Sequence, residues 1–170
     1  DYDCKPKGQY GILKLAGEWL VKDYTRRSNL VYTIIRPSAV YGPYDVEDRV
    51  ISKFLSQAIH GKELIVNGAN DSLDFTYVDD IAAGLMYAGQ RRITDTFNIT
   101  GGYGYTLLEA AEMIKNITSS DSELVIGQGL DKSMPKRGVL DISKAKNLLG
   151  YSPAVNLLHG LTVTSTWMGS

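Results

Sequence analysis

The chain has 170 residues, 44% of them hydrophobic and 22% charged, a composition that supports one globular fold with a sizeable core. Its formal net charge is −1, so no basic surplus is available to bind nucleic-acid phosphates. The apolar runs are short and interrupted, which excludes a membrane-spanning helix, and one cysteine with two separated histidines predicts neither a disulfide nor a metal site. The first residues lack a secretion-signal pattern, so we expect a cytoplasmic location.

Hydrophobic periodicity and turn residues predict alternating helices and strands. Taken in chain order, the expected elements are a helix over 10–25, a strand over 30–35, a loop over 38–48, a helix over 50–59, strands over 64–66 and 75–78, a helix over 79–88, a strand over 96–99, a helix over 106–117, a strand over 124–126, and helices over 143–149 and 157–167. The alternation places the chain in the α/β class with some parallel sheet.

Several local signals fix the expected ends of these elements. The run at 30–35 is almost continuously apolar and β-branched, as in a strand buried on both faces, and Pro37 ends it. Thr106 and Glu109 have the spacing of a capping box, and Gly150 stops the preceding helix.

The first expected helix carries a tyrosine and a lysine one turn apart, Tyr10 and Lys14. Oxidation of a carbinol by hydride transfer needs a proton acceptor, and a tyrosine serves only when a nearby cation favours its phenolate. Taken alone, this spacing is more typical of a surface pair on an amphipathic helix than of a catalytic pair. The pair therefore becomes a catalytic candidate only in a wider context.

Five blocks of sequence supply that context. They are YGILKLAGE (10–18), IIRPSAVYGP (34–43), LDFTYVDDIAAGL (73–85), FNITGG with YTLLEAAEMI (97–114), and LDISKAKNLLGYSP (140–153). In this order and spacing the chain resembles the extended short-chain dehydrogenase/reductase family, in particular its NAD(P)-dependent nucleotide-sugar epimerases and dehydratases. A steroid- or flavonoid-type reductase of the same superfamily is a further alternative.

The resemblance implies roles for particular residues. Tyr10 would be the catalytic acid/base, and Lys14 would hold the nicotinamide ribose of NAD or NADP. The main chain of Pro37, Ser38, Ala39 and Val40 would line the nicotinamide. The nucleotide-sugar substrate would be bound by a group comprising Ala39, Leu64, Val66, Leu73, Phe75 and Arg137. For the aromatic side chain of Phe75, packing within the core is an equal alternative.

The sequence also departs from the family pattern. Many members have Asn where Ala39 stands and a phosphate-binding Arg where Leu73 stands. Lys136 or Arg137 could replace the missing charge, the alternative being a solvated pair of loop charges. The glycine-rich dinucleotide loop of the family is not matched, because the Gly-rich stretch at 101–104 precedes a late helix and is interpreted as a turn.

We therefore expect the C-terminal half of a doubly wound Rossmann-like fold, with the first half of its sheet missing. Residues 1–45 and 79–100 would be the remnant of the cofactor domain, and 46–78 and 101–170 the substrate subdomain. Either a missing N-terminal half restores the enzyme, or the chain is a non-catalytic module. In the second case the apolar side chains of the Tyr10 helix would bind a second copy or another partner.

Overall fold

A computed structural model describes residues 4–46, 48–129 and 138–169 of the chain. Six helices and eight short strands follow in the order α1 (Gly8–Ser28), β1 (Thr33–Pro37), β2 (Ala39–Tyr41), α2 (Val50–Ile59), β3 (Leu64–Val66), β4 (Ser72–Leu73), β5 (Phe75–Tyr77), α3 (Val78–Arg91), β6 (Asp95–Ile99), β7 (Tyr105–Thr106), α4 (Leu107–Ile117), β8 (Leu124–Ile126), α5 (Ser143–Leu149) and α6 (Leu157–Gly169) within these residues.

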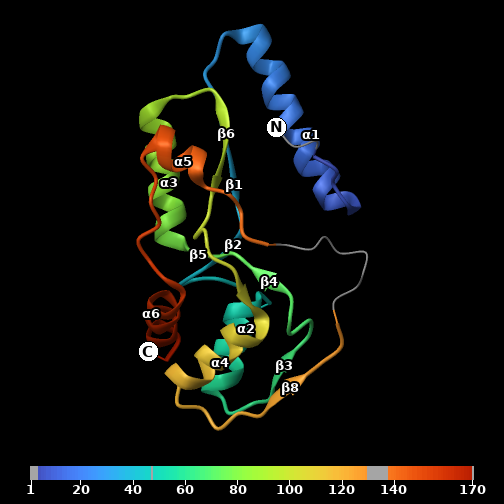
Figure 1. Cartoon of the computed structure of the whole chain (residues 1–170), viewed down its shortest axis with the longest axis vertical. Helices are drawn as coiled ribbons and strands as arrows, with labels where there is room; N and C mark the ends of the chain where they lie inside the picture. Colours follow the sequence, from blue (N-terminus) through green and yellow to red (C-terminus); the bar gives the residue numbers. More distant parts are fainter. Residues whose placement is uncertain (1–3, 47, 130–137, 170) are drawn as a thin grey trace.

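The strands form four separate pairs. Three pairs are parallel, β1 with β6, β2 with β5 and β3 with β8, whereas β4 and β7 are antiparallel. The parallel partners are far apart in the sequence and are joined through helices, as parallel strands require. The α/β class with parallel pairing is thus confirmed (Figure 1).

The larger hydrophobic core joins α2, α4 and α6 to the strands at one end of the molecule (Figure 1). Its centre is aromatic. The ring of Tyr41 meets Phe75 edge-on with 6.4 Å between centroids and Tyr77 with 5.6 Å, an arrangement that favours aromatic pairs. Burial raises the pKa of the Tyr41 hydroxyl, which donates to the carbonyl of Leu157 at 3.4 Å.

A second core lies between α3, α5 and β6. Phe97 and Ile99 of β6 are fully buried in it, together with Tyr151, whose hydroxyl donates to the carbonyl of Thr100 at 2.9 Å. The side chains of Ile142, Ala145, Leu149 and Tyr151 thus pack with the cofactor-side elements, although residues 101–170 were assigned to the substrate subdomain. The division into two functional domains stays a prediction.

Helix α1 lies apart from both cores. None of its 21 residues is buried, and in Figure 1 it stands beside β1, running in the opposite direction to it. Strand β1 is consequently only half-buried, and the expectation that it is buried on both faces is wrong for this chain. The reason is that β1 has β6 as its neighbour and α1 contributes no buried cover to it.

Most local sequence signals hold. The Thr106–Glu109 capping box is formed in both directions, and Gly150 adopts the left-handed conformation that ends α5. The three short strands β2, β4 and β7 were not expected from the sequence. Across the described ranges, no helix is both long and apolar enough to cross a membrane.

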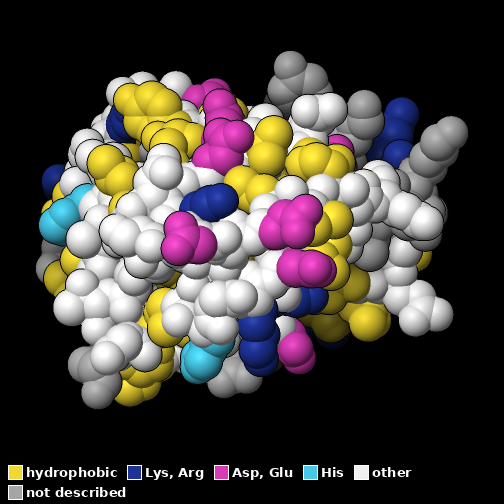
Figure 2. All heavy atoms as spheres, turned by 90° about the horizontal axis from the view of Figure 1, so that it is seen from below, with side chains coloured by type: hydrophobic (Ala, Val, Ile, Leu, Met, Phe, Trp, Pro, Cys, Tyr) yellow, Lys and Arg dark blue, Asp and Glu magenta, His cyan; other side chains and the backbone are white. Residues whose placement is uncertain are grey.

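The face seen in Figure 2 carries mixed charges. Lys and Arg side chains are scattered between Asp and Glu rather than gathered into a patch of one sign. This face therefore offers no continuous basic surface for a polyanion.

Candidate functional site

Tyr10 and Lys14 lie together on the exposed surface of α1. The Tyr10 side chain is 73% exposed, and the Lys14 ammonium lies 5.4 Å from the centroid of its ring. The helix accounts for this, because residues four apart occupy one face. Within the described residues neither polar group makes a side-chain hydrogen bond, so both are free to bind a ligand.

An ion pair that the sequence analysis missed attaches α1 to the sheet. The Arg36 guanidinium of β1 donates two hydrogen bonds to the Glu18 carboxylate, from Nε and Nη2, each at 2.6 Å. The hydrogen bond from Arg36 lowers the pKa of Glu18, and the same bond raises the pKa of Arg36. Glu18 follows Lys14 by one helical turn, so the pair connects the Tyr10 face to β1.

The segment at residues 37–40 changes from one strand pair to another. Strand β1 ends at Pro37, and β2 begins at Ala39, where the main-chain N–H donates to the carbonyl of Asp74 at 3.2 Å. Because α1 and β1 run in opposite directions, the Tyr10 end of α1 and the Pro37 end of β1 lie toward the same end (Figure 1). The four residues expected to line the nicotinamide are thus on the Tyr10 side of β1.

Three of the six predicted substrate-binding residues line one cavity of about 300 Å³. Ala39 of β2 stands directly opposite Phe75 of β5 in the strand register, and Leu73 of β4 completes the apolar wall. Pockets that bind small ligands begin at about this volume and combine apolar walls with a few polar groups. The sequence resemblance therefore named residues that the fold does bring together.

Arg49 and Asp45 provide charge at this cavity, and the sequence analysis missed both. Arg49 Nε lies 3.4 Å from Asp45 Oδ1, which also accepts a hydrogen bond from the N–H of Val46 at 2.9 Å. The Arg49 side chain is 59% exposed, so its donors remain largely free. A cation thus lines the same cavity as Leu73.

Leu64 and Val66, also predicted to bind the substrate, do not line this cavity. Leu64 and Val66 are fully buried side chains of β3 in the larger core. Any contact of this strand with a ligand would therefore come from the main chain or from neighbouring residues. Arg137, the sixth predicted residue, and Lys136 lie outside the described residues.

The glycine-rich stretch after β6 is a structural turn. The N–H of Gly101 donates to Thr76 Oγ1 at 2.9 Å, and that of Gly102 donates to both carboxylate oxygens of Asp74 at 3.2 Å. Burial raises the pKa of Asp74, whose side chain is fully enclosed. Because these N–H groups already have acceptors, they are not presented to a phosphate.

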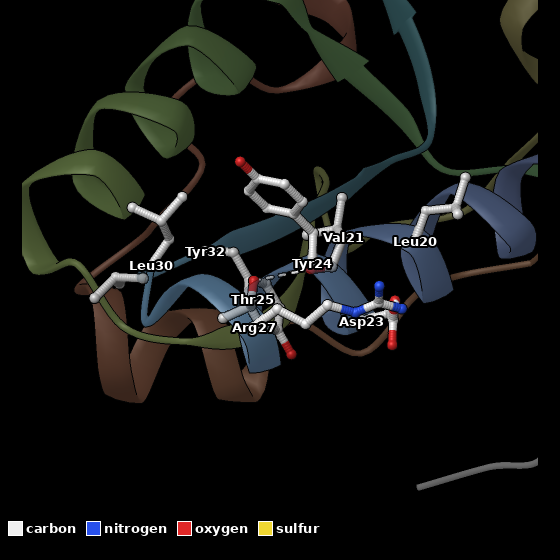
Figure 3. Close-up of a pocket in the computed structure, with 9 residues that line it drawn as sticks. Leu20, Val21, Asp23, Tyr24, Thr25, Arg27, Leu30 and Tyr32 are labelled. Atoms are coloured by element: carbon white, nitrogen blue, oxygen red, sulfur yellow. Dashed lines mark hydrogen bonds and ion pairs between the residues drawn. The ribbon is translucent and has the colours of Figure 1, made fainter.

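A second, more apolar hollow lies at the other end of α1. Its volume is about 530 Å³, and Figure 3 shows Leu20 and Tyr24 of α1 on one side and Leu30 and Tyr32 of the following segment on the other. Tyr24 is 65% and Leu20 71% exposed. The described residues that line it include none of the predicted site residues.

The sequence matches the description "NAD dependent epimerase/dehydratase family" over residues 1–100, more than half of the chain. The chain belongs to this family. Over 168 residues, 97% of its length, it is 32% identical to an uncharacterized UDP-glucose epimerase of Bacillus subtilis, and over 151 residues it is 34% identical to UDP-glucuronic acid decarboxylase 6 of Arabidopsis thaliana. These matches cover 53% and 44% of the two relatives, so the chain spans about half of their length.

Crystal structures of epimerases share the fold. The UDP-glucose 4-epimerase of Thermotoga maritima, solved with UDP-glucose, has a TM-score of 0.88 at 30% identity, with 94% of this chain and 53% of that one covered. A variant of UDP-glucuronic acid 4-epimerase from Bacillus cereus, in complex with UDP-4-deoxy-4-fluoro-glucuronic acid and NAD, has a TM-score of 0.92 at 29% identity, covering 99% and 55%.

NAD is the cofactor of this epimerase/dehydratase family, and structures of the Bacillus cereus enzyme contain it. The residues present here fit the nicotinamide side of such a cofactor. The phenol of Tyr10 and the ammonium of Lys14 are exposed side by side and unbonded among the described residues. The glycine-rich turn that receives the pyrophosphate in such folds is not matched in this sequence.

Proposed function

We propose that this chain supplies the catalytic Tyr/Lys pair and part of the substrate cavity of an NAD-dependent nucleotide-sugar epimerase or dehydratase. The observation that supports the proposal is the juxtaposition of Tyr10 and Lys14 on an exposed helix face bonded to β1. The named activities of the relatives point to a sugar linked to UDP as the substrate class.

The proposed chemistry begins at a sugar hydroxyl. The phenol oxygen of Tyr10 takes the hydroxyl proton as the carbinol is oxidised to a ketone, with the Lys14 ammonium beside its ring. NAD supplies the hydride acceptor and later donor. In epimerisation the ketone is reduced from its other face and Tyr10 returns the proton, whereas a dehydratase eliminates water from the keto-sugar.

Arg49 is proposed to bind the diphosphate of the substrate. Its guanidinium is the described cation at the cavity of Ala39, Leu73 and Phe75, and a guanidinium can donate two parallel hydrogen bonds to phosphate oxygens. Leu73 and Ala39 provide apolar contact, which suits one face of the uracil or sugar ring. Asp45 would orient the guanidinium, since it holds one side of the group at 3.4 Å.

The test of the proposed function is the substitution Tyr10→Phe. It should lower turnover of a UDP-sugar by about 10²–10⁴-fold, since one proton-transfer group contributes that much, and it should leave NAD binding intact. The matched control is Tyr24→Phe, because Tyr24 lies on the same helix and is similarly exposed at 65%. The preparation is this chain, or this chain combined with a segment equivalent to the N-terminal half of its relatives. Turnover unchanged by Tyr10→Phe would refute the assignment.

A second candidate function is self-association without catalysis, which the apolar surface of α1 favours. Ile12, Leu13, Trp19 and Leu20 are 54%, 70%, 67% and 71% exposed. Contiguous apolar patches of this kind mark interaction surfaces. The chain should then elute as a dimer in size-exclusion chromatography, and Leu13→Lys should convert it to a monomer while Met86→Lys on α3 should not. A monomer at all concentrations would contradict this candidate. A homo-oligomer and a cytoplasmic location stay predictions.

A further inference from the structure

Helix α1 carries the proposed catalytic pair, yet none of its residues is fully buried. Burial of apolar side chains in a core therefore does not fix its position on the described part of the molecule. The hydrogen bonds that join its side chains to the sheet are the two between Glu18 and Arg36, each 2.6 Å long. Just before the helix, Arg36 Nη2 also donates to Cys4 Sγ at 3.6 Å, so Arg36 is the centre of this attachment.

The attachment lies at a definite distance from the reacting groups. Tyr10 is eight residues before Glu18, about 12 Å along the helix at 1.5 Å per residue. Ser38 and Val40 are two and four residues beyond Arg36, about 7–13 Å along the strand direction. Because α1 and β1 are antiparallel, both stretches extend the same way from the ion pair (Figure 1). A tilt at the pair is therefore magnified at Tyr10.

We propose that Glu18 and Arg36 are positioning residues that hold the Tyr10–Lys14 face at a fixed distance and angle from residues 38–40. The inference rests on the proposed function, because positioning has a catalytic meaning only if Tyr10 transfers the proton. Neither residue touches the sugar or the nicotinamide in this assignment. Their role is to preorganise the groups that do.

The geometry of the pair suits this role better than an ordinary surface salt bridge. The two parallel bonds of a guanidinium and a carboxylate fix orientation as well as distance, which a lysine cannot do. The Glu18 side chain is only 14% exposed, so water competes less for it. By contrast, Arg27 and Asp23 are 76% and 49% exposed and belong to the same helix, so their pair cannot position α1 on β1.

The first experiment measures the placement of α1 in this chain without any ligand. Spin labels on Ala16→Cys in α1 and Gln90→Cys in α3, both in a Cys4→Ser background, give the distance distribution between the helix and the second core by double electron–electron resonance. Glu18→Gln should broaden the distribution, and the reversed pair Glu18→Arg with Arg36→Glu should narrow it again. Asp23→Asn is the matched control and should leave it unchanged. An unchanged distribution in Glu18→Gln overturns the proposal.

The second experiment asks whether the placement matters for turnover. In a preparation that turns over a UDP-sugar, Glu18→Gln should lower kcat on the order of 10–100-fold, as expected for misplaced reacting groups, with KM nearly unchanged. The reversed pair should restore most of the loss. A broadened distribution with unchanged kcat overturns the positioning role. If Tyr10→Phe leaves turnover unchanged, the proposed function fails, whatever Glu18→Gln does.

Discussion

Two glycines of α3 are expected to respond oppositely to alanine. Gly84 is buried against β6, and a Cβ built there falls well inside van der Waals contact with Ile99 Cγ2, with Cδ1 and Cγ1 at 3.3 Å. Gly89 lies five residues further along the same helix with nothing within 4 Å of the equivalent position. The pair therefore separates the effect of the clash from the effect of helix propensity.

The magnitudes follow from these surroundings. Gly89→Ala should stabilise the chain by roughly 0.5–1 kcal/mol, because alanine loses less backbone entropy in a helix. Gly84→Ala gains the same propensity but overfills a packed contact, which costs about 1–3 kcal/mol. Ile99 cannot yield easily, since it is fully buried and its branched side chain has few allowed rotamers. The clash is thus expected to decide the sign at Gly84.

Urea denaturation followed by circular dichroism measures both variants under one condition. The Ile99→Ala variant provides the decisive comparison, because it removes all three of the side-chain atoms near the new methyl group. In that background Gly84→Ala should become neutral or stabilising. If Gly84→Ala stabilises the otherwise unchanged chain as much as Gly89→Ala does, the close packing of α3 on β6 is refuted.

Two other predictions concern aspartates that form hydrogen bonds or an ion pair with distant segments of the chain. Asp80→Ala removes the acceptor of the N–H groups of residues 154 and 155, which lie at 2.8 and 3.1 Å, and should lower the free energy of unfolding by on the order of 1–3 kcal/mol for each donor. The matched control is Asp79→Ala, because Asp79 is the exposed neighbour. Equal losses of stability in the two variants would contradict the argument. Burial alone would raise the pKa of Asp95, but Lys144 at 2.9 Å and the N–H of Thr96 lower it overall. The ionised Asp95 therefore stabilises the fold at any pH above its pKa in the unfolded chain. This stabilisation is lost as the pH falls through the lower pKa that Asp95 has in the folded chain. In Asp95→Asn the free energy of unfolding should consequently fall less steeply as the solution is acidified.

Local chemistry was enough to place several elements by sequence alone. Helix α5 ends where Gly150 provides a left-handed cap, and α4 begins at the Thr106 capping box, because these signals act over a few neighbouring residues. Strand β2 escaped notice because its three residues become a strand only through pairing with β5. The burial of β1 was overestimated because an apolar run shows what a strand can bury, not what covers it.

In the candidate site, too, contacts between residues close in the sequence could be predicted, whereas contacts between distant residues could not. Tyr10 and Lys14 could be recognised as a pair because one helical turn separates them. Glu18 and Arg36 could not, since they are 18 residues apart and meet only after α1 has turned back beside β1. Arg49 was missed for a related reason: no sequence block marks it, and only the cavity brings it together with Leu73.

The way the two halves of the site are held suggests that binding and chemistry can be separated. The cavity wall at Ala39 continues directly into Tyr41, which is anchored in the larger core by two aromatic contacts. The Tyr10 face has no such anchor, because no residue of α1 is fully buried and the helix is joined to the sheet through the bonds of Arg36. Loosening α1 should consequently leave the cavity and substrate affinity intact while the proton acceptor moves away. A variant that loosens α1 should therefore lower kcat and leave KM unchanged, because it removes an interaction made only in the transition state.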